Sequence, residues 1–231
     1  YTGQKKKYED NMKVINEDNI GAVCVESRPH PDFCGPKWWK DMDIILDEAK
    51  KRNMKVWILD DSHFPTGYAN GAIKSKPENL CRQSICCRIY DLTEQKKLHI
   101  DSKDLLHPDP FVKSQVENFI LKEPFRQFDD DKLLCLFAVP YEKETKTDGF
   151  KNFQKSVNLI PYIKNDTLDW EVPSSDKSIK WKAYALHLTR NMGYHRDYIN
   201  MLNQTSCKVL LDAVYEPHFD HYKEEFGKTI A

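Results

Sequence analysis

Two short apolar runs that end in carboxylates, with a helical segment between them, constrain the fold of this chain more than any other feature. Residues 21–26 (GAVCVE) and 55–61 (KVWILDD) are rich in β-branched and aromatic residues and have the length of buried strands. Pro36 after Gly35 is typical of a helix start, and the basic run 50–52 is typical of a helix end. A strand, a helix and a strand over about 30 residues predict a parallel crossover, and therefore an α/β fold. The helix between the strands has one apolar face, made of Trp38, Trp39, Met42, Ile45, Leu46 and Ala49.

The whole chain divides into three parts. A helix over residues 5–17 precedes the first strand, and short apolar runs separated by polar, proline-containing stretches begin after Leu80. We therefore expect first βα units over 1–81, a mainly β insertion over 82–190, and a return to the α/β part over 191–231. The returning helix should bend at Pro217, because proline removes a backbone donor and clashes with the preceding turn. The predicted strands of the insertion are 86–92, 132–139, 157–163 and 181–188.

Charge and composition exclude several classes of partner. The 35 Lys and Arg against 36 Asp and Glu give a net charge of -1, which argues against nucleic acid or an anionic membrane as a partner bound through bulk charge. The longest apolar run without charge, residues 133–141, is far below the roughly 18 residues that span a bilayer. Neither GxGxxG nor GxxxxGK[ST] occurs, so the common phosphate-binding loops are absent from the sequence.

Cysteine usage favours a reducing compartment. Seven cysteines, an odd number without a CxxC pair, do not suggest a disulfide framework. No export signal is visible, and Tyr1 in place of an initiating Met suggests that an upstream part was trimmed. We therefore expect a cytoplasmic protein.

Acidic and polar residues follow both predicted strands directly. Glu26 and Arg28 follow the first strand, and Asp60, Asp61 and His63 follow the second. Functional groups of parallel sheets and barrels gather at these carboxyl ends. Enzymes that cleave sugars use one carboxylic acid and one carboxylate, so a sugar site is indicated. Two alternatives remain: Asp60 could cap a helix or pair with an arginine, and His63 could point into solvent. Nearby aromatic residues that could contact sugar rings, or pack in the core, are Phe33, Phe64 and Tyr68.

The sequence gives little support for a metal or another cofactor. His218 and His221 have a spacing that could ligate a metal, but nothing else completes such a site, and a surface location is the favoured interpretation. Cys86 and Cys87, beside Cys81, lie on a predicted strand, where neighbouring residues face opposite sides. We expect no metal site and no cofactor; calcium is possible but not supported by the sequence.

Four segments carry a resemblance to a known family. Residues 20–29 (IGAVCVESRP), 56–71 (VWILDDSHFPTGYANG), 196–203 (RDYINMLN) and 222–230 (YKEEFGKTI) resemble the catalytic barrel of α-L-rhamnosidase-like glycoside hydrolases, the family 106 type. The corresponding family motif reads close to W-I-Y-D-E-x-x-W-P-S-G-x-A-G-G. The resemblance implies part of a TIM (β/α)8 barrel interrupted by a β-rich insertion, and glycoside hydrolysis with inversion by two carboxylic acids. This sequence departs from the family motif at Asp61, Phe64 and Thr66, where the family has Glu, Trp and Ser.

The resemblance also implies which residues would bind the substrate and what the chain would lack. In the family an acidic strand follows a helix like 205–226, so at least one catalytic acid is expected beyond Ala231. The first barrel strand is expected before the helix over residues 5–17. The segment alone should then be inactive, and its partners would be a carbohydrate and the remainder of a longer chain. The residues expected to bind substrate are Glu26, Arg28, Asp60, Asp61, His63, Thr66 and Asp197.

Two other functional interpretations stay open. The chain could be a non-catalytic carbohydrate-binding domain in which insertion aromatics such as Trp170 and Trp181 bind glycans. It could also be an interaction or structural domain whose acids at the strand ends only cap helices. A metal hydrolase that uses His218 and His221 is a weaker alternative.

Overall fold

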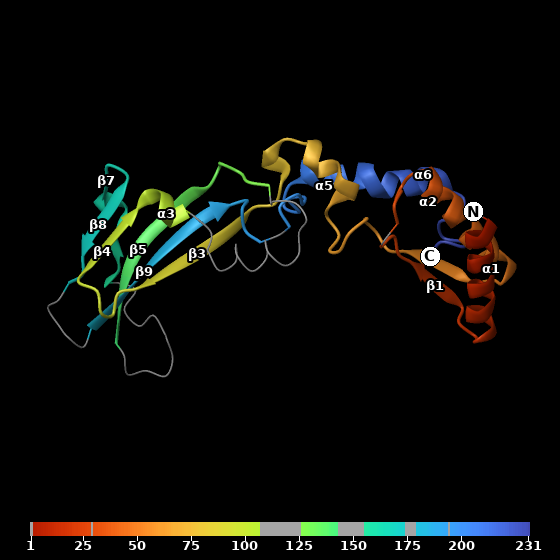
Figure 1. The fold of residues 1–231 in the computed structure, drawn as a ribbon, viewed down its shortest axis with the longest axis horizontal. Coiled ribbons are helices and arrows are strands. Elements are labelled where there is room, and N and C mark those ends of the chain that lie inside the picture. Colours follow the sequence, from red (N-terminus) through yellow and green to blue (C-terminus); the bar gives the residue numbers. More distant parts are fainter. Residues whose placement is uncertain (1, 29, 107–125, 143–154, 174–178, 194) are drawn as a thin grey trace. The chain divides into compact units, whose positions relative to one another are not determined.

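The chain folds into two compact units in the computed structural model, which describes all residues except 1, 29, 107–125, 143–154, 174–178 and 194 (Figure 1). One unit, here called the α/β unit, consists of Tyr1–Arg82 and Asp197–Ala231, and the other, the β unit, consists of Gln83–Arg196. The chain therefore returns to the α/β unit after Arg196 rather than after residue 190. Hydrogen bonds explain this boundary, because Asn191 and Arg196 bond to backbone groups of Phe128 and Arg126 in the β unit.

The first half of the α/β unit has the element order that the sequence predicts. β1 and β2 pair in parallel, with Val23 opposite Val56, so the segment between them is a parallel crossover. Trp38, Met42, Ile45, Leu46 and Ala49 are buried on one face of the crossover helix. The bounds are α1 Thr2–Glu17, β1 Ala22–Val25, α2 Pro36–Lys51 and β2 Lys55–Ile58, followed by the 3₁₀ helices η1 Ala69–Ser75 and η2 Glu78–Leu80.

The C-terminal part of the α/β unit is a helix in three pieces. α5 covers Gln204–Leu210, the π-helical turn η5 covers Leu211–Tyr215, and α6 covers Glu216–Tyr222. The irregularity lies directly before Pro217, where the sequence predicts a bend. After α6 the chain reaches the sheet, where Ile230 bridges Val56 in parallel, so a third segment joins the β1–β2 layer. The described residues form this short parallel layer and no closed barrel.

The described residues of the β unit form two antiparallel sheets, whose strands are labelled in Figure 1. One has four strands in the order β3-β9-β5-β6, and the other has three in the order β4-β8-β7. Strand β9 is the centre of the first sheet because it pairs with both β3 and β5 along most of its length. The bounds are β3 Ser84–Asp91, β4 Lys97–Asp101, α3 Ser102–Leu106, β5 Lys132–Glu142, β6 Val157–Asn158, η4 Ile160–Tyr162, β7 Ile163–Lys164, β8 Thr167–Glu171 and β9 Ile179–Thr189.

The strand predicted over residues 157–163 is wrong, because this run is divided between the two sheets. Its first residues form β6 in the four-stranded sheet and its last residue begins β7 in the three-stranded sheet. Pro161 lies in the 3₁₀ turn between them, where the missing backbone donor of proline costs no ladder hydrogen bond. Asn165 and Asp166 then turn the chain with positive φ angles of 49° and 59°, as a tight hairpin requires.

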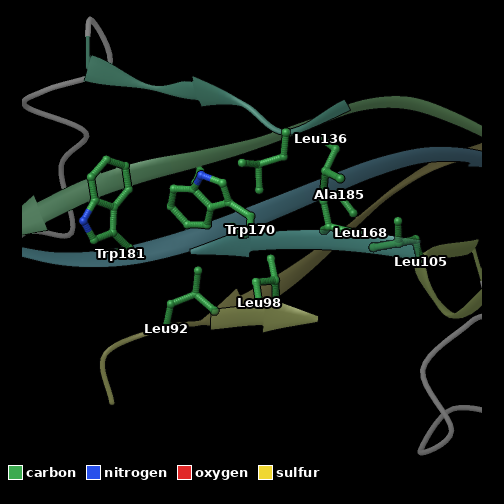
Figure 2. Close-up of a cluster of buried hydrophobic side chains, with 11 residues drawn as sticks. Leu92, Leu98, Leu105, Leu136, Leu168, Trp170, Trp181 and Ala185 are labelled. Atoms are coloured by element: carbon green, nitrogen blue, oxygen red, sulfur yellow. The ribbon is translucent and has the colours of Figure 1, made fainter. Parts of the chain in front are cut away.

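The core of the β unit includes Trp170 and Trp181, the two residues that would bind glycans in a carbohydrate-binding domain. Trp170 is 4% exposed and Trp181 is 8% exposed, and their rings meet edge to face at 5.5 Å. Figure 2 shows them among leucines contributed by both sheets. The interpretation that these two residues bind glycans is therefore wrong, since buried rings have no face to offer a sugar. The other buried members of the cluster are Leu92, Leu98, Leu105, Leu136, Ala138, Leu159, Leu168, Ala183 and Ala185.

No helix among the described residues has both the length and the apolar composition that crossing a membrane requires.

Candidate functional site

The loop after β2, residues 60–70, is folded around Asp61. Its carboxylate accepts backbone N–H bonds from Ser62 and Asn70 at one oxygen, at 2.7 and 2.8 Å, and from Gly67 and Ala69 at the other, both at 2.9 Å. Asp61 is 1% exposed. In this structure its carboxylate therefore holds the loop, whereas the resemblance implies a substrate contact.

The backbone of the 60–70 loop is held in an unusual conformation. Asp61, Ala69 and Asn70 have φ angles of 65°, 52° and 51°, in the left-handed region that residues other than glycine seldom occupy. Gly67 has φ 139° and lies against the ring of Tyr198, where an added Cβ would come within 2.2 Å of Cζ. Such strain persists only where surrounding contacts impose it, and it concentrates at functional sites. The bonds to Asp61 and the Tyr198 ring are the contacts that impose it here.

Asp60 has a different environment from its neighbour, because among the described residues its carboxylate accepts hydrogen bonds from hydroxyl groups and from no backbone N–H. Thr66 Oγ1 donates to Asp60 Oδ1 at 2.7 Å, and the Tyr215 hydroxyl donates to Asp60 Oδ2. No Lys or Arg of the described residues pairs with this carboxylate, which is partly exposed. Burial raises the pKa of Tyr215, and its hydrogen bond to Asp60 raises this pKa further, so the phenol remains a donor.

Glu26 and Arg28 form an ion pair at the end of β1. Arg28 Nε lies 2.5 Å from Glu26 Oε1, and the guanidinium carbon lies 5.3 Å from the centre of the Phe64 ring. Phe64 belongs to the 60–70 loop and is 75% exposed. The cation–π contact therefore connects the end of β1 with the loop after β2, beside an aromatic face that is open to solvent.

The remaining predicted residues lie on or beside the same loop. His63 is exposed, with Nδ1 3.0 Å from Ser62 Oγ. Asp197 begins the returning chain, which runs along the loop: Ile199 N donates to Gly67 O at 2.9 Å, and the Tyr198 hydroxyl donates to Thr66 O. The structure thus brings residues from three distant segments to one end of the parallel layer. Of the predicted residues, Glu26, Arg28, Asp60, Asp61, His63 and Thr66 lie directly after the paired strands β1 and β2. Asp197 precedes Tyr198 and Ile199, which bond to the loop.

Sequence reasoning missed Tyr215 and Tyr198 as parts of this site. Tyr215 contacts Asp60 across 155 positions of sequence, and Tyr198 contacts Thr66 across 132. For Tyr215 the sequence contains one signal, since Pro217 predicts an irregular helix near it. For Tyr198 the resemblance points only to the neighbouring residue, Asp197.

The prediction that His218 lies on the surface is wrong. His218 is 4% exposed, with Nε2 accepting from Trp38 Nε1 at 2.9 Å and Nδ1 2.6 Å from Val214 O. Both ring nitrogens are therefore occupied within the core, and the pair with His221 cannot ligate a metal in this arrangement. His221 is exposed and stacks on Trp39, with ring centres 4.0 Å apart. Among the described residues, no group of three or more His, Cys, Asp and Glu side chains has the arrangement of a metal site.

Cys34 lies close to this buried histidine. Its Sγ is 3.9 Å from His218 Nδ1. Burial, followed by the negative charge of Asp61, raises the pKa of the Cys34 thiol to about 12. The group is therefore a neutral thiol at physiological pH, and it lacks the thiolate character of a nucleophile.

Lowering the pH from 7.5 to 5 is expected to destabilise the protein through its buried histidines. Burial lowers the pKa of His218 and of His187, whereas in the unfolded chain both titrate near about 6.5. Below that pH the unfolded state binds more protons, so the stability present above about 6.5 is lost as the pH falls towards the folded pKa values. Urea unfolding at several pH values measures this loss. His218→Gln should flatten the pH dependence and the exposed His221→Gln should not; equal profiles for these two variants would contradict the assignment.

Comparisons with known proteins give no relative from which to take a function: no family model matches this sequence, and no curated protein or solved structure matches it either.

Proposed function

We propose that the α/β unit binds a carbohydrate at the ends of β1 and β2, as part of a glycoside hydrolase similar to the α-L-rhamnosidases. The observation that supports this most is the environment of Asp60, a carboxylate at a strand end that two hydroxyl groups orient and that no described Lys or Arg neutralises. It lies beside a strained loop that carries an exposed aromatic ring. The two donors to Asp60 are side-chain hydroxyls rather than helix N–H groups or a cation, so neither a helix cap nor an ion pair describes this carboxylate among the described residues.

The chemistry of these groups suits a neutral, hydroxyl-rich ligand. A carboxylate oxygen has two acceptor positions, so each oxygen of Asp60 can accept one more hydrogen bond from a sugar hydroxyl. The exposed ring of Phe64 offers a flat apolar surface for the C–H face of a sugar. The Arg28 guanidinium over this ring holds it from one side and leaves further N–H donors for ligand oxygens.

We place this site in a wider proposal about the whole protein. The parallel layer of β1, β2 and the segment at Ile230, with helices before each strand, would be part of a (β/α)8 barrel, and the β unit would be its insertion. Hydrolysis with inversion would need a second acid, which the resemblance places outside residues 1–231. A cytoplasmic location belongs to the same proposal, supported by seven cysteines that are free thiols.

Titration of the chain with sugars tests the proposed site. We expect L-rhamnose or an aryl α-L-rhamnoside to bind without being hydrolysed, and Asp60→Asn to weaken binding at least tenfold by removing a charged acceptor. Asp43→Asn is the matched control, because Asp43 on α2 also accepts from a tyrosine hydroxyl but lies on a helix. Calorimetry measures both affinities. Wild-type chain that binds no sugar of a broad panel, or an equal loss in both variants, would refute the site; rapid hydrolysis would refute the expected second acid.

An interaction domain is the second candidate, and one observation favours it. On the face of the four-stranded sheet that lies opposite the core, Ile85 and Ile89 of β3 are exposed together with Cys87. Antiparallel sheets usually turn polar residues to solvent, so an apolar outer face suggests a contact surface. The same titration separates the candidates, because an interaction domain predicts no sugar binding by wild-type chain.

A further inference from the structure

The helix that carries Tyr215 changes its winding at this residue. The backbone N–H of Glu216 donates to Leu211 O, five residues earlier, which makes Leu211–Tyr215 a π-helical turn between α5 and α6. Isolated π turns inside α-helices are uncommon and occur often at functional sites. One extra residue in a turn rotates the positions on either side relative to each other by about 100°. The direction in which Tyr215 points therefore depends on this turn.

Pro217 provides the physical cause of the π turn. Proline has no N–H for the helical ladder, and its ring would clash with the carbonyl of the residue four positions earlier, Ala213. Widening the preceding turn by one residue separates these groups. After Pro217 the α-helical pattern resumes in α6, so the irregularity is confined to the turn that carries Tyr215.

The turn places a hydroxyl on the carboxylate that forms the centre of the proposed site. The Tyr215 hydroxyl donates to Asp60 Oδ2, while Thr66 donates to Oδ1 from within the 60–70 loop. One donor on each oxygen fixes the plane of the carboxylate. The acceptor positions that remain then have a defined direction, which lowers the entropy lost when a ligand binds.

We propose that Tyr215 is a positioning residue that orients Asp60 for its ligand, and that the π turn before Pro217 is the element that places it. The assignment of a ligand rests on the proposed carbohydrate site. Tyr215 acts through Asp60 and needs no contact with the sugar itself. It retains its proton, because burial and the adjacent carboxylate both raise the pKa of its phenol.

The same helix contains a matched pair outside the site. The Tyr222 hydroxyl donates to Asp43 Oδ1 at 2.9 Å and to Trp39 O at 3.0 Å. This pair repeats the tyrosine–carboxylate chemistry on α6 without a π turn, and its carboxylate belongs to helix α2 rather than to a strand end. Tyr222→Phe therefore controls for the general effect of removing a tyrosine hydroxyl from this helix.

Four variants of the full 231-residue chain test the inference through affinity for L-rhamnose. Tyr215→Phe should weaken binding about tenfold, the scale of one hydrogen bond to a charged group, and Tyr222→Phe should leave it unchanged. Pro217→Ala permits a regular helix and should weaken binding to a similar degree. The double variant Tyr215→Phe with Pro217→Ala should bind as Tyr215→Phe does, because Pro217 acts through Tyr215. Wild-type affinity in Tyr215→Phe, or additive losses in the double variant, would overturn the inference.

A second measurement does not depend on the sugar. The ¹³C shift of the Tyr215 ring carbon that bears the hydroxyl, followed against pH, reports its pKa, which should lie above the ordinary value of about 10. Asp60→Asn and Pro217→Ala should each lower it, and Asp43→Asn should not. An unchanged value in either of the first two variants would overturn the positioning role. Wild-type chain that binds no sugar would instead refute the proposed function, and this titration would then decide the Tyr215–Asp60 contact by itself.

Discussion

Replacing Asp61 with alanine is expected to lower the free energy of unfolding by about 4 kcal/mol, because several buried N–H groups lose their acceptor together. The Asp61 carboxylate accepts four backbone hydrogen bonds that tie the two ends of the 60–70 loop, and it is buried. The left-handed backbone at Ala69 and Asn70 also loses the contacts that hold it. Urea unfolding followed by circular dichroism measures the change.

Two further variants make this result interpretable. Asp61→Asn keeps one acceptor but turns an NH₂ group towards the same backbone donors, so we expect most of the loss to remain. Asp212→Ala, at an exposed helix position paired with Lys208, should change stability by no more than about 0.5 kcal/mol. A loss in Asp61→Ala no larger than that of Asp212→Ala would show that the carboxylate does not hold the loop.

Replacing Trp170 with alanine should destabilise the β unit by about 3–5 kcal/mol, the range for large aromatic residues in cores. Trp170 packs against Trp181 and against leucines of both sheets (Figure 2), so the substitution removes both burial and an edge-to-face aromatic contact. Calorimetry of the full chain, with the β-unit transition assigned by NMR, measures the shift.

The control for Trp170 is an apolar residue of the same unit that faces solvent. Ile89→Thr on β3 keeps a β-branched side chain and should change stability by about 0.5 kcal/mol or less. Sugar binding should be unaffected in both variants while they stay folded, because the proposed site lies in the α/β unit. A folded Trp170→Ala variant with wild-type stability would contradict the packing described for the core.

The order of elements in the α/β unit could be predicted from local patterns. The start of α2 at Pro36 follows from the fixed φ of proline, and its buried face follows from apolar residues that recur at helical spacing. The change to short strands after Leu80 also agrees with the structure. The prediction of one strand over residues 157–163 is wrong because apolar character alone does not show that Pro161 divides the run between two sheets.

The sequence by itself determined which residue types follow the strands, since a strand end fixes Glu26 and Asp60 at one edge of a parallel layer. It could not distinguish Asp60 from Asp61. The Asp61 carboxylate is enclosed by its own loop, whereas the Asp60 carboxylate accepts hydrogen bonds from two hydroxyl groups. That distinction depends on the left-handed backbone at Asp61, and on Tyr215, which lies 155 positions away from Asp60 in the sequence. Only the tertiary structure decides such contacts, because they depend on how distant segments pack and not on local periodicity.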